Sequence, residues 1–152
     1  MKPLDTTVEE VLRKAIQSEV ETRVYYQKMA ERAGSPMVRT RMLQLADKEL
    51  VHRAKMERRY REETGQEPPA LAPANVELPP DLVNLDITRA LKHALERERE
   101  SESYFRFMAE RAPDTVLGAL FMELAEIEWK HKTDLQAEYD ASAPPDSFLL
   151  DI

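Results

Sequence analysis

Cysteine is absent from the 152 residues of the sequence. Its absence excludes disulfides, thiolate zinc sites, iron–sulfur clusters and a rubredoxin-type iron centre within this chain. If the protein carries out a redox reaction, it therefore needs an external electron donor.

Long apolar runs are absent as well. No stretch approaches the roughly 20 apolar residues of a membrane span, and the first residues lack the apolar core of a signal peptide. The net charge of −7 argues against a nucleic-acid partner. We therefore expect a soluble, cytoplasmic protein that binds neither membrane nor nucleic acid.

Glycine is scarce, with three residues, whereas alanine, leucine, glutamate, arginine and methionine are abundant. This composition predicts an almost wholly helical chain. A capping box formed by Thr6 and Glu9 should open a first helix over about residues 7–33. Gly34 is expected to end this helix in a left-handed conformation.

Prolines mark the next breaks. Ser35 and Pro36 should open a second helix that runs to about Glu63. Residues 64–83 contain five prolines and cannot be helical. About 20 extended residues at roughly 3.3 Å each can return along a whole helix, which would make helices two and three parallel. The alternative is a flexible linker between two hairpins that pair with another chain.

Asn84 or Asp86 can cap a third helix that ends near Ala112, and a fourth helix ends near Asp140. The predicted fold class is therefore all-α: a ferritin-like four-helix bundle with one long crossover connection between helices two and three. We expect a single domain over residues 1–140.

Residues 141–152 are predicted to form an irregular C-terminal tail. Phe148, Leu149, Leu150 and Ile152 follow two prolines and should fold back over the end of the bundle. Docking of this tail on a partner is the alternative.

The sequence contains an internal repeat. Residues 8–61 align without a gap with residues 87–140 and share 15 identities over 54 positions. Chance supplies only a few identities, so the chain is interpreted as a duplicated helical hairpin with a pseudo-two-fold relation between its halves.

A Glu-x-x-His pair occurs in each repeat. Glu49 and His52 return 79 residues later as Glu128 and His131. Residues three apart lie on one face of a helix, so each pair offers a carboxylate and an imidazole to a common point. One such pair is weak evidence for a metal site, but two pairs related by a repeat are strong evidence.

Two more glutamates lie at the same level of the expected core. Steps of three and four residues along the helices place Glu19 and Glu98 on the buried faces. A buried, unpaired carboxylate costs several kcal/mol or takes up a proton, so two divalent cations would balance the four carboxylates. The candidate metal ligands are Glu19, Glu49, His52, Glu98, Glu128 and His131.

Carboxylate-rich ligation with one imidazole per metal suits iron or manganese better than structural zinc. Because di-iron helical bundles have this composition, we predict two iron ions, with manganese or a mixed pair as alternatives. Glu49 and Glu128 are assigned as bridging carboxylates, and His52 and His131 as one terminal ligand for each metal. Tyr26 is a candidate for a hydroxyl beside a ligand carboxylate. The structural alternative is a metal-free polar layer that fixes the helix register.

A second apolar stripe lies off the expected core on helices two and four. It consists of Leu43, Leu50, Met122 and Trp129. Such stripes often widen a core, but a tryptophan there also suits a subunit contact. We predict a homodimer.

The repeated Glu…Glu-x-x-His pattern, with Ala-x-x-x-Glu-x-x-Thr/Ser-x-x-Tyr-Tyr/Phe around Glu19 and Glu98, resembles the rubrerythrin branch of the ferritin-like superfamily over residues 8–140. The resemblance implies a di-iron centre at the six candidate ligands and reduction of hydrogen peroxide at the diferrous site. The chain departs from the family in lacking the four cysteines of a rubredoxin domain. It also has Ser101 where the family usually has an additional glutamate.

Ser101 leaves two further interpretations open. The symmetric set of six ligands also resembles the ferroxidase centre of bacterioferritins, which implies oxidation of Fe²⁺ by O₂. A non-enzymatic helical module that binds a partner through its outer stripe or tail is the third interpretation, and it would tolerate apolar residues in place of the ligands.

Overall fold

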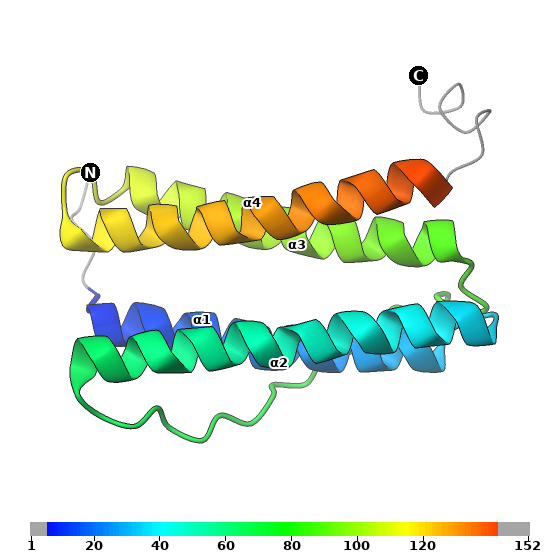
Figure 1. The fold of residues 1–152 in the computed structure, drawn as a ribbon, viewed down its shortest axis with the longest axis horizontal. Helices are drawn as coiled ribbons and strands as arrows, with labels where there is room; N and C mark the ends of the chain where they lie inside the picture. Colours follow the sequence, from blue (N-terminus) through cyan, green and yellow to red (C-terminus); the bar gives the residue numbers. More distant parts are fainter. Residues whose placement is uncertain (1–5, 143–152) are drawn as a thin grey trace. The chain divides into compact units, whose positions relative to one another are not determined.

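The computed structural model describes residues 6–142 and contains four helices (Figure 1). They are α1 (Val8–Glu31), α2 (Pro36–Thr64), α3 (Ile87–Glu110) and α4 (Val116–Ser142). The described residues contain no strand beyond one isolated bridge. This content confirms the all-α fold class and fits a ferritin-like four-helix bundle.

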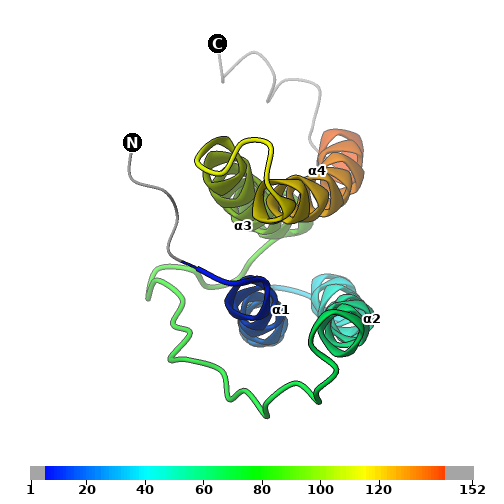
Figure 2. The same cartoon turned by 90° about the vertical axis from the view of Figure 1, so that its left-hand side faces the viewer.

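The helices form two compact units, which we treat separately. Hairpin one (residues 6–86) contains α1, α2 and the connection (residues 65–86), whereas hairpin two (residues 87–142) contains α3 and α4. The two helices lie side by side within each hairpin in both views (Figures 1 and 2). No helix in the described part of the chain is long and apolar enough to cross a membrane.

The start of α1 lies one residue away from the predicted capping box. Thr7 is the N-cap, and its hydroxyl oxygen accepts a hydrogen bond from the backbone N–H of Glu10 at 3.2 Å. The hydroxyl of Thr6 instead donates to the Glu10 carboxylate at 2.8 Å. Both threonines thus have hydrogen-bonding partners, which explains why the sequence pattern alone selected the wrong one.

The turn after α1 has a different cause from the predicted one. Gly34 does not have a positive φ, so the expected left-handed helix end was wrong. A Cβ at Gly34 would lie 3.1 Å from the backbone carbonyl carbon and oxygen of Asn84. Glycine is therefore favoured because the connection approaches closely, not because of its own backbone conformation.

The starts of α2 and α3 follow the predicted signals, and α2 ends one residue beyond the predicted Glu63. Ser35 caps α2 by accepting from the N–H of Val38 at 3.3 Å, and Pro36 is the first helical residue. Gly65, with φ 67°, ends α2 in the left-handed conformation. Helix α3 begins directly after Asp86, one of the two predicted caps.

The connection runs along α1 in the same direction as this helix, because successive residues of α1 contact successive residues of the connection. Gln17 donates to the carbonyl of Ala72 at 2.9 Å, and Lys28 donates to the carbonyl of Val76. Arg32 donates to the carbonyls of Pro79 at 3.2 Å and Leu82 at 2.6 Å. The backbones of Ala33 and Leu85 then form a parallel bridge. The connection therefore returns along α1, as predicted.

Apolar side chains hold the connection as well. Leu78, Leu82 and Leu85 are 7%, 5% and 0% exposed, so each buries most of its surface. Between them, these leucines and the hydrogen bonds to carbonyl oxygens give an irregular segment a defined path.

Helix α4 continues beyond the predicted end at Asp140. It reaches Ser142, whose carbonyl oxygen accepts a hydrogen bond from the Thr88 hydroxyl at 3.1 Å. This contact with the start of α3 explains the extra helical residues. The predictions for residues 143–152, including Phe148, Leu149, Leu150 and Ile152, lie outside the described residues.

Candidate metal centre

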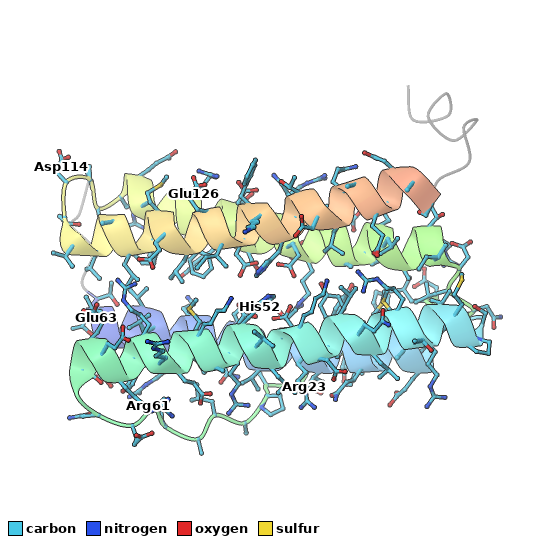
Figure 3. All side chains as sticks on the ribbon, viewed as in Figure 1. Arg23, His52, Arg61, Glu63, Asp114 and Glu126 are labelled. Atoms are coloured by element: carbon cyan, nitrogen blue, oxygen red, sulfur yellow. The ribbon has the colours of Figure 1, made fainter. Side chains whose placement is uncertain are left out.

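Hairpin one brings together the first three predicted ligands, which we call group one. Glu19 belongs to α1, and Glu49 and His52 lie three residues apart on one face of α2. Figure 3 labels His52 on α2. One potential ligand atom from each residue lies within 4.8 Å of the others. Nδ1 of His52 is 3.4 Å from Oε2 of Glu49 and 3.7 Å from Oε2 of Glu19.

Hairpin two repeats this arrangement as group two. Glu98 from α3 meets Glu128 and His131 from α4, again with ligand atoms within 4.8 Å of one another. Nδ1 of His131 is 3.6 Å from Oε2 of Glu128 and 3.8 Å from Oε2 of Glu98. The six predicted ligands therefore form two similar groups of three.

The four carboxylates are buried, between 3% and 7% exposed. In group one, burial and then hydrogen bonding to Glu49 raise the pKa of Glu19 from 4.5 to about 8. In group two, burial alone would lower the pKa of His131, but the neighbouring carboxylates of Glu128 and Glu98 outweigh it and raise the pKa to about 10. Each group thus attracts positive charge, either as a proton or as a metal cation.

The donor set fits a pair of hard or borderline divalent cations. Each group supplies two carboxylates and one imidazole, so two cations would neutralise the four negative charges. Oxygen-rich ligation with a single nitrogen suits iron or manganese, whereas structural zinc sites usually contain thiolates, which this chain lacks.

The family model described as Rubrerythrin matches residues 10–139, a span that contains both groups. The chain belongs to the rubrerythrin family. A hypothetical protein from Pyrococcus furiosus has a similar solved structure, with 23% identity, a TM-score of 0.54 and 90% coverage of each chain, which supports the fold alone. No curated protein matches the chain.

Membership of the rubrerythrin family and the two Glu/Glu/His groups together fit a di-iron centre. The two iron ions predicted from the sequence are therefore supported by both the fold and the site. The bridging roles of Glu49 and Glu128 stay a prediction, as does ligation by the other members of each group.

Tyr26 lies in the core of this rubrerythrin-family protein, 1% exposed and seven residues after Glu19 on α1. Its ring meets the ring of Tyr25 edge-on at a centroid distance of 5.7 Å. The equivalent pair in hairpin two is Tyr104 and Phe105, at 5.4 Å. Only hairpin one therefore has the inner hydroxyl, and its role beside the ligands stays a prediction.

Glu102 was missed by the sequence analysis. It is 7% exposed, and its two carboxylate oxygens accept from Lys132 and Arg106, each at 2.6 Å. Burial would raise the pKa of Glu102, but these two cations outweigh it and lower the pKa. The spacing of Glu102 and Arg106, four residues apart on one helix, was the available signal. The residue next to it, Ser101, is half-buried.

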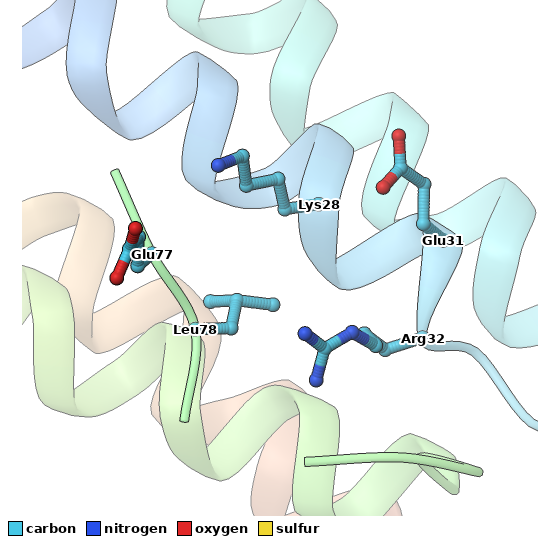
Figure 4. A pocket seen from close by; sticks show the side chains of 5 residues that line it. All are labelled: Lys28, Glu31, Arg32, Glu77 and Leu78. Atoms are coloured by element: carbon cyan, nitrogen blue, oxygen red, sulfur yellow. The ribbon is translucent and has the colours of Figure 1, made fainter. Parts of the chain in front are cut away.

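A pocket of about 250 Å³ lies between α1 and the connection (Figure 4). It is lined by Lys28, Glu31, Arg32, Glu77 and Leu78. None of these residues belongs to either group, and Lys28 and Arg32 already donate to carbonyl oxygens of the connection. The pocket is thus part of the contact that fixes the connection.

Proposed function

We propose that this protein is a non-haem di-iron oxidoreductase that reduces hydrogen peroxide and receives its electrons from an external donor. The observation that carries the proposal is the presence of the same Glu/Glu/His geometry in both hairpins. Membership of the chain in the rubrerythrin family supports a di-iron centre. When bound, two ferrous ions supply the two electrons that convert hydrogen peroxide and two protons into two water molecules.

The residues of the chain bind the metals and control their surroundings. The buried carboxylates of Glu19, Glu49, Glu98 and Glu128 provide negative charge, and the imidazoles of His52 and His131 complete each group. Glu19 holds a proton near neutral pH in the metal-free protein and must release it to act as a ligand. The Tyr26 hydroxyl would orient a ligand carboxylate through a hydrogen bond.

The alternative reaction is the oxidation of Fe²⁺ by O₂ in a ferroxidase. Ser101 favours this reaction, because it stands where the rubrerythrin family usually has an additional glutamate. In this reaction Fe²⁺ is a substrate that leaves as ferric product. Manganese or a mixed pair would bind the same donor set.

A homodimer is part of the proposal. Leu43, Leu50, Met122 and Trp129 are between 40% and 44% exposed, so the apolar stripe noticed in the sequence remains open on each hairpin. The same stripe would serve a non-enzymatic interaction module. We propose no membrane or nucleic-acid partner, and a cytoplasmic location.

Stopped-flow spectroscopy separates the three functions. The protein is loaded anaerobically with two equivalents of Fe²⁺ and mixed in parallel with H₂O₂ and with O₂. The peroxidase function predicts faster reaction with H₂O₂ and iron that stays bound through repeated reduction. The ferroxidase function predicts a comparable reaction with O₂ and continued turnover of added Fe²⁺.

Matched variants make this experiment specific. Glu49→Gln with Glu128→Gln should abolish the reaction because both groups lose a charged ligand. Glu62→Gln, which changes an exposed glutamate paired with Arg58 at 3.2 Å, should leave it intact. A protein that takes up no iron, and whose ligand variants keep a partner-binding function, would support the interaction module instead.

A further inference from the structure

A partly buried ionic bridge links α3 to α4 beside group two. Lys132 of α4 donates to Oε1 of Glu102 at 2.6 Å, and Arg106 of α3 donates to Oε2 at 2.6 Å. Arg106 also lies 3.6 Å from the carboxylate of Glu126 on α4. We call the contact between Glu102 and Lys132 the Glu102 bridge.

The Glu102 bridge lies next to the ligands in both helices. Glu102 follows Glu98 by four residues, one helical turn, and Lys132 directly follows His131. The side chains of Glu102 and Lys132 are 9% and 25% exposed, so water screens this pair less than it screens a surface pair. The bridge therefore joins the two helices at the level where they supply ligands.

Hairpin one cannot form this bridge. The repeat positions of Glu102 and Lys132 are Arg23 and Arg53, two residues of the same charge. Arg53 pairs within its own helix with Glu57, at 3.7 Å. The Nε atom of Arg23 is buried and has no hydrogen-bond partner among the described residues. Two groups with identical ligands thus have surroundings of different charge.

We propose that Glu102 is a positioning residue for group two: through Lys132 it holds α3 and α4 in the arrangement that binds metal, and group two consequently binds metal more tightly than group one. The inference rests on the proposed function, because it requires that the groups bind metal. It assigns no ligand role to Glu102, whose carboxylate oxygens are taken up by two cations.

The physical reason is preorganisation. A ligand set that is already held at the binding distance loses less conformational freedom when the metal binds. Residues that orient metal ligands typically change metal affinity by about 10- to 100-fold when they are removed. Glu102 acts through the helices rather than by touching a ligand, so we expect the lower end of this range.

The test is a calorimetric titration with Co²⁺ in variants that retain one group. Glu19→Ala with His52→Ala leaves group two, and Glu98→Ala with His131→Ala leaves group one. We expect group two to bind Co²⁺ more tightly. Adding Glu102→Gln should weaken group two about tenfold, and leave the affinity of group one unchanged within about twofold. An equal affinity of the two groups, or an unchanged group two, would overturn the proposal.

Lys132→Gln separates positioning from simple charge. If only the local charge matters, removing a cation beside group two tightens Co²⁺ binding, whereas positioning predicts that it weakens binding as Glu102→Gln does. Tighter binding would therefore contradict the proposal. Glu62→Gln at the exposed pair with Arg58 is the control and should leave both groups unchanged.

A gain-of-function variant keeps the test decisive if the Glu102 variants fold poorly. Arg23→Glu would place a carboxylate opposite Arg53 and build the same bridge in hairpin one. Group one should then bind Co²⁺ several-fold more tightly, and more tightly than in Arg23→Gln, which removes the charge without building a bridge. Equal effects of the two variants would overturn the proposal. If the unmodified protein binds no Co²⁺, the proposed function fails rather than the role of Glu102.

Discussion

The two hairpins share a ligand set but differ in the polar contacts outside it. Hairpin one has an irregular connection that is hydrogen-bonded along α1, whereas hairpin two has a partly buried ionic bridge between its helices. The repeat has therefore preserved the residues that meet at the metal centre. The polar contacts outside the ligand set have diverged, which shows that one site geometry is compatible with different neighbouring contacts.

The largest expected effect comes from removing the feature that the hairpins share. Glu49→Ala with Glu128→Ala takes one buried carboxylate from each group, so we expect iron binding to fall by more than about 100-fold. Anaerobic Fe²⁺ titration measures the loss. The single variants test the bridging assignment: loss of a bridging Glu49 or Glu128 should weaken the binding of both ions, whereas loss of one ion alone would make that glutamate a ligand of its own group only.

The pH dependence of stability should distinguish the hairpins in the metal-free protein. The pKa of Glu19 is raised from 4.5 to about 8, so the stability it contributes is present below pH 4.5 and is lost as the pH rises to 8. The pKa of His131 is raised from 6.5 to about 10, so its contribution is present below pH 6.5 and is lost as the pH rises to 10.

Urea unfolding between pH 4 and 10 measures how the unfolding free energy changes over these two pH ranges. Glu19→Gln should reduce the change between pH 4.5 and 8, and His131→Gln the change between pH 6.5 and 10, because each removes one titrating group. If the pH dependence of the unfolding free energy is unchanged in both variants, other groups cause it. Bound metal should reduce both changes, since it replaces the protons.

Arg32 and Arg111 occupy equivalent positions in the repeat but have different partners. Arg32→Ala removes two hydrogen bonds to the connection and should cost about 2 kcal/mol of unfolding free energy. Arg111 lies 5.7 Å from the centre of the Phe107 ring, and its loss should cost about 0.5 kcal/mol. Denaturant unfolding of both variants gives the comparison. Equal losses would show that the connection does not support hairpin one.

The smallest expected effect concerns the hydroxyl present only in hairpin one. Tyr26→Phe makes the first hairpin resemble the second, which has Phe105, and should change the unfolding free energy by about 1 kcal/mol or less. If the hydroxyl orients a ligand, the reaction with H₂O₂ should slow as well. Phe105→Tyr is the matched variant, and an identical rate in Tyr26→Phe and the unmodified protein would exclude the role.

The sequence predicted the helices and the two groups because both depend on local spacing. Ser35 with Pro36 marked the start of α2, and the recurrence of Glu-x-x-His identified residues that the structure brings together. The role of Gly34 could not be predicted, because it depends on Asn84, which is 50 residues away in the sequence. Close approaches of this kind leave no local pattern.

Glu102 escaped prediction for a different reason. The steps of three and four residues that selected Glu98 passed over Glu102, and the repeat directed attention away from it because its equivalent is Arg23. A search for identities between repeats finds what the halves share, and it overlooks the charges in which they differ. The exchange of a carboxylate for a guanidinium was visible in the sequence, but its meaning depends on the contact with Lys132.

Helix α1 contacts the connection mainly through the backbone of the connection. Gln17, Lys28 and Arg32 all donate to carbonyl oxygens, which every residue type provides. Apart from the buried leucines, the side chains of this segment are therefore weakly constrained, and its sequence can drift during evolution without loss of its path. The sequences of relatives are expected to vary most in the connection. Replacing residues 66–75 by an epitope tag should leave the protein folded.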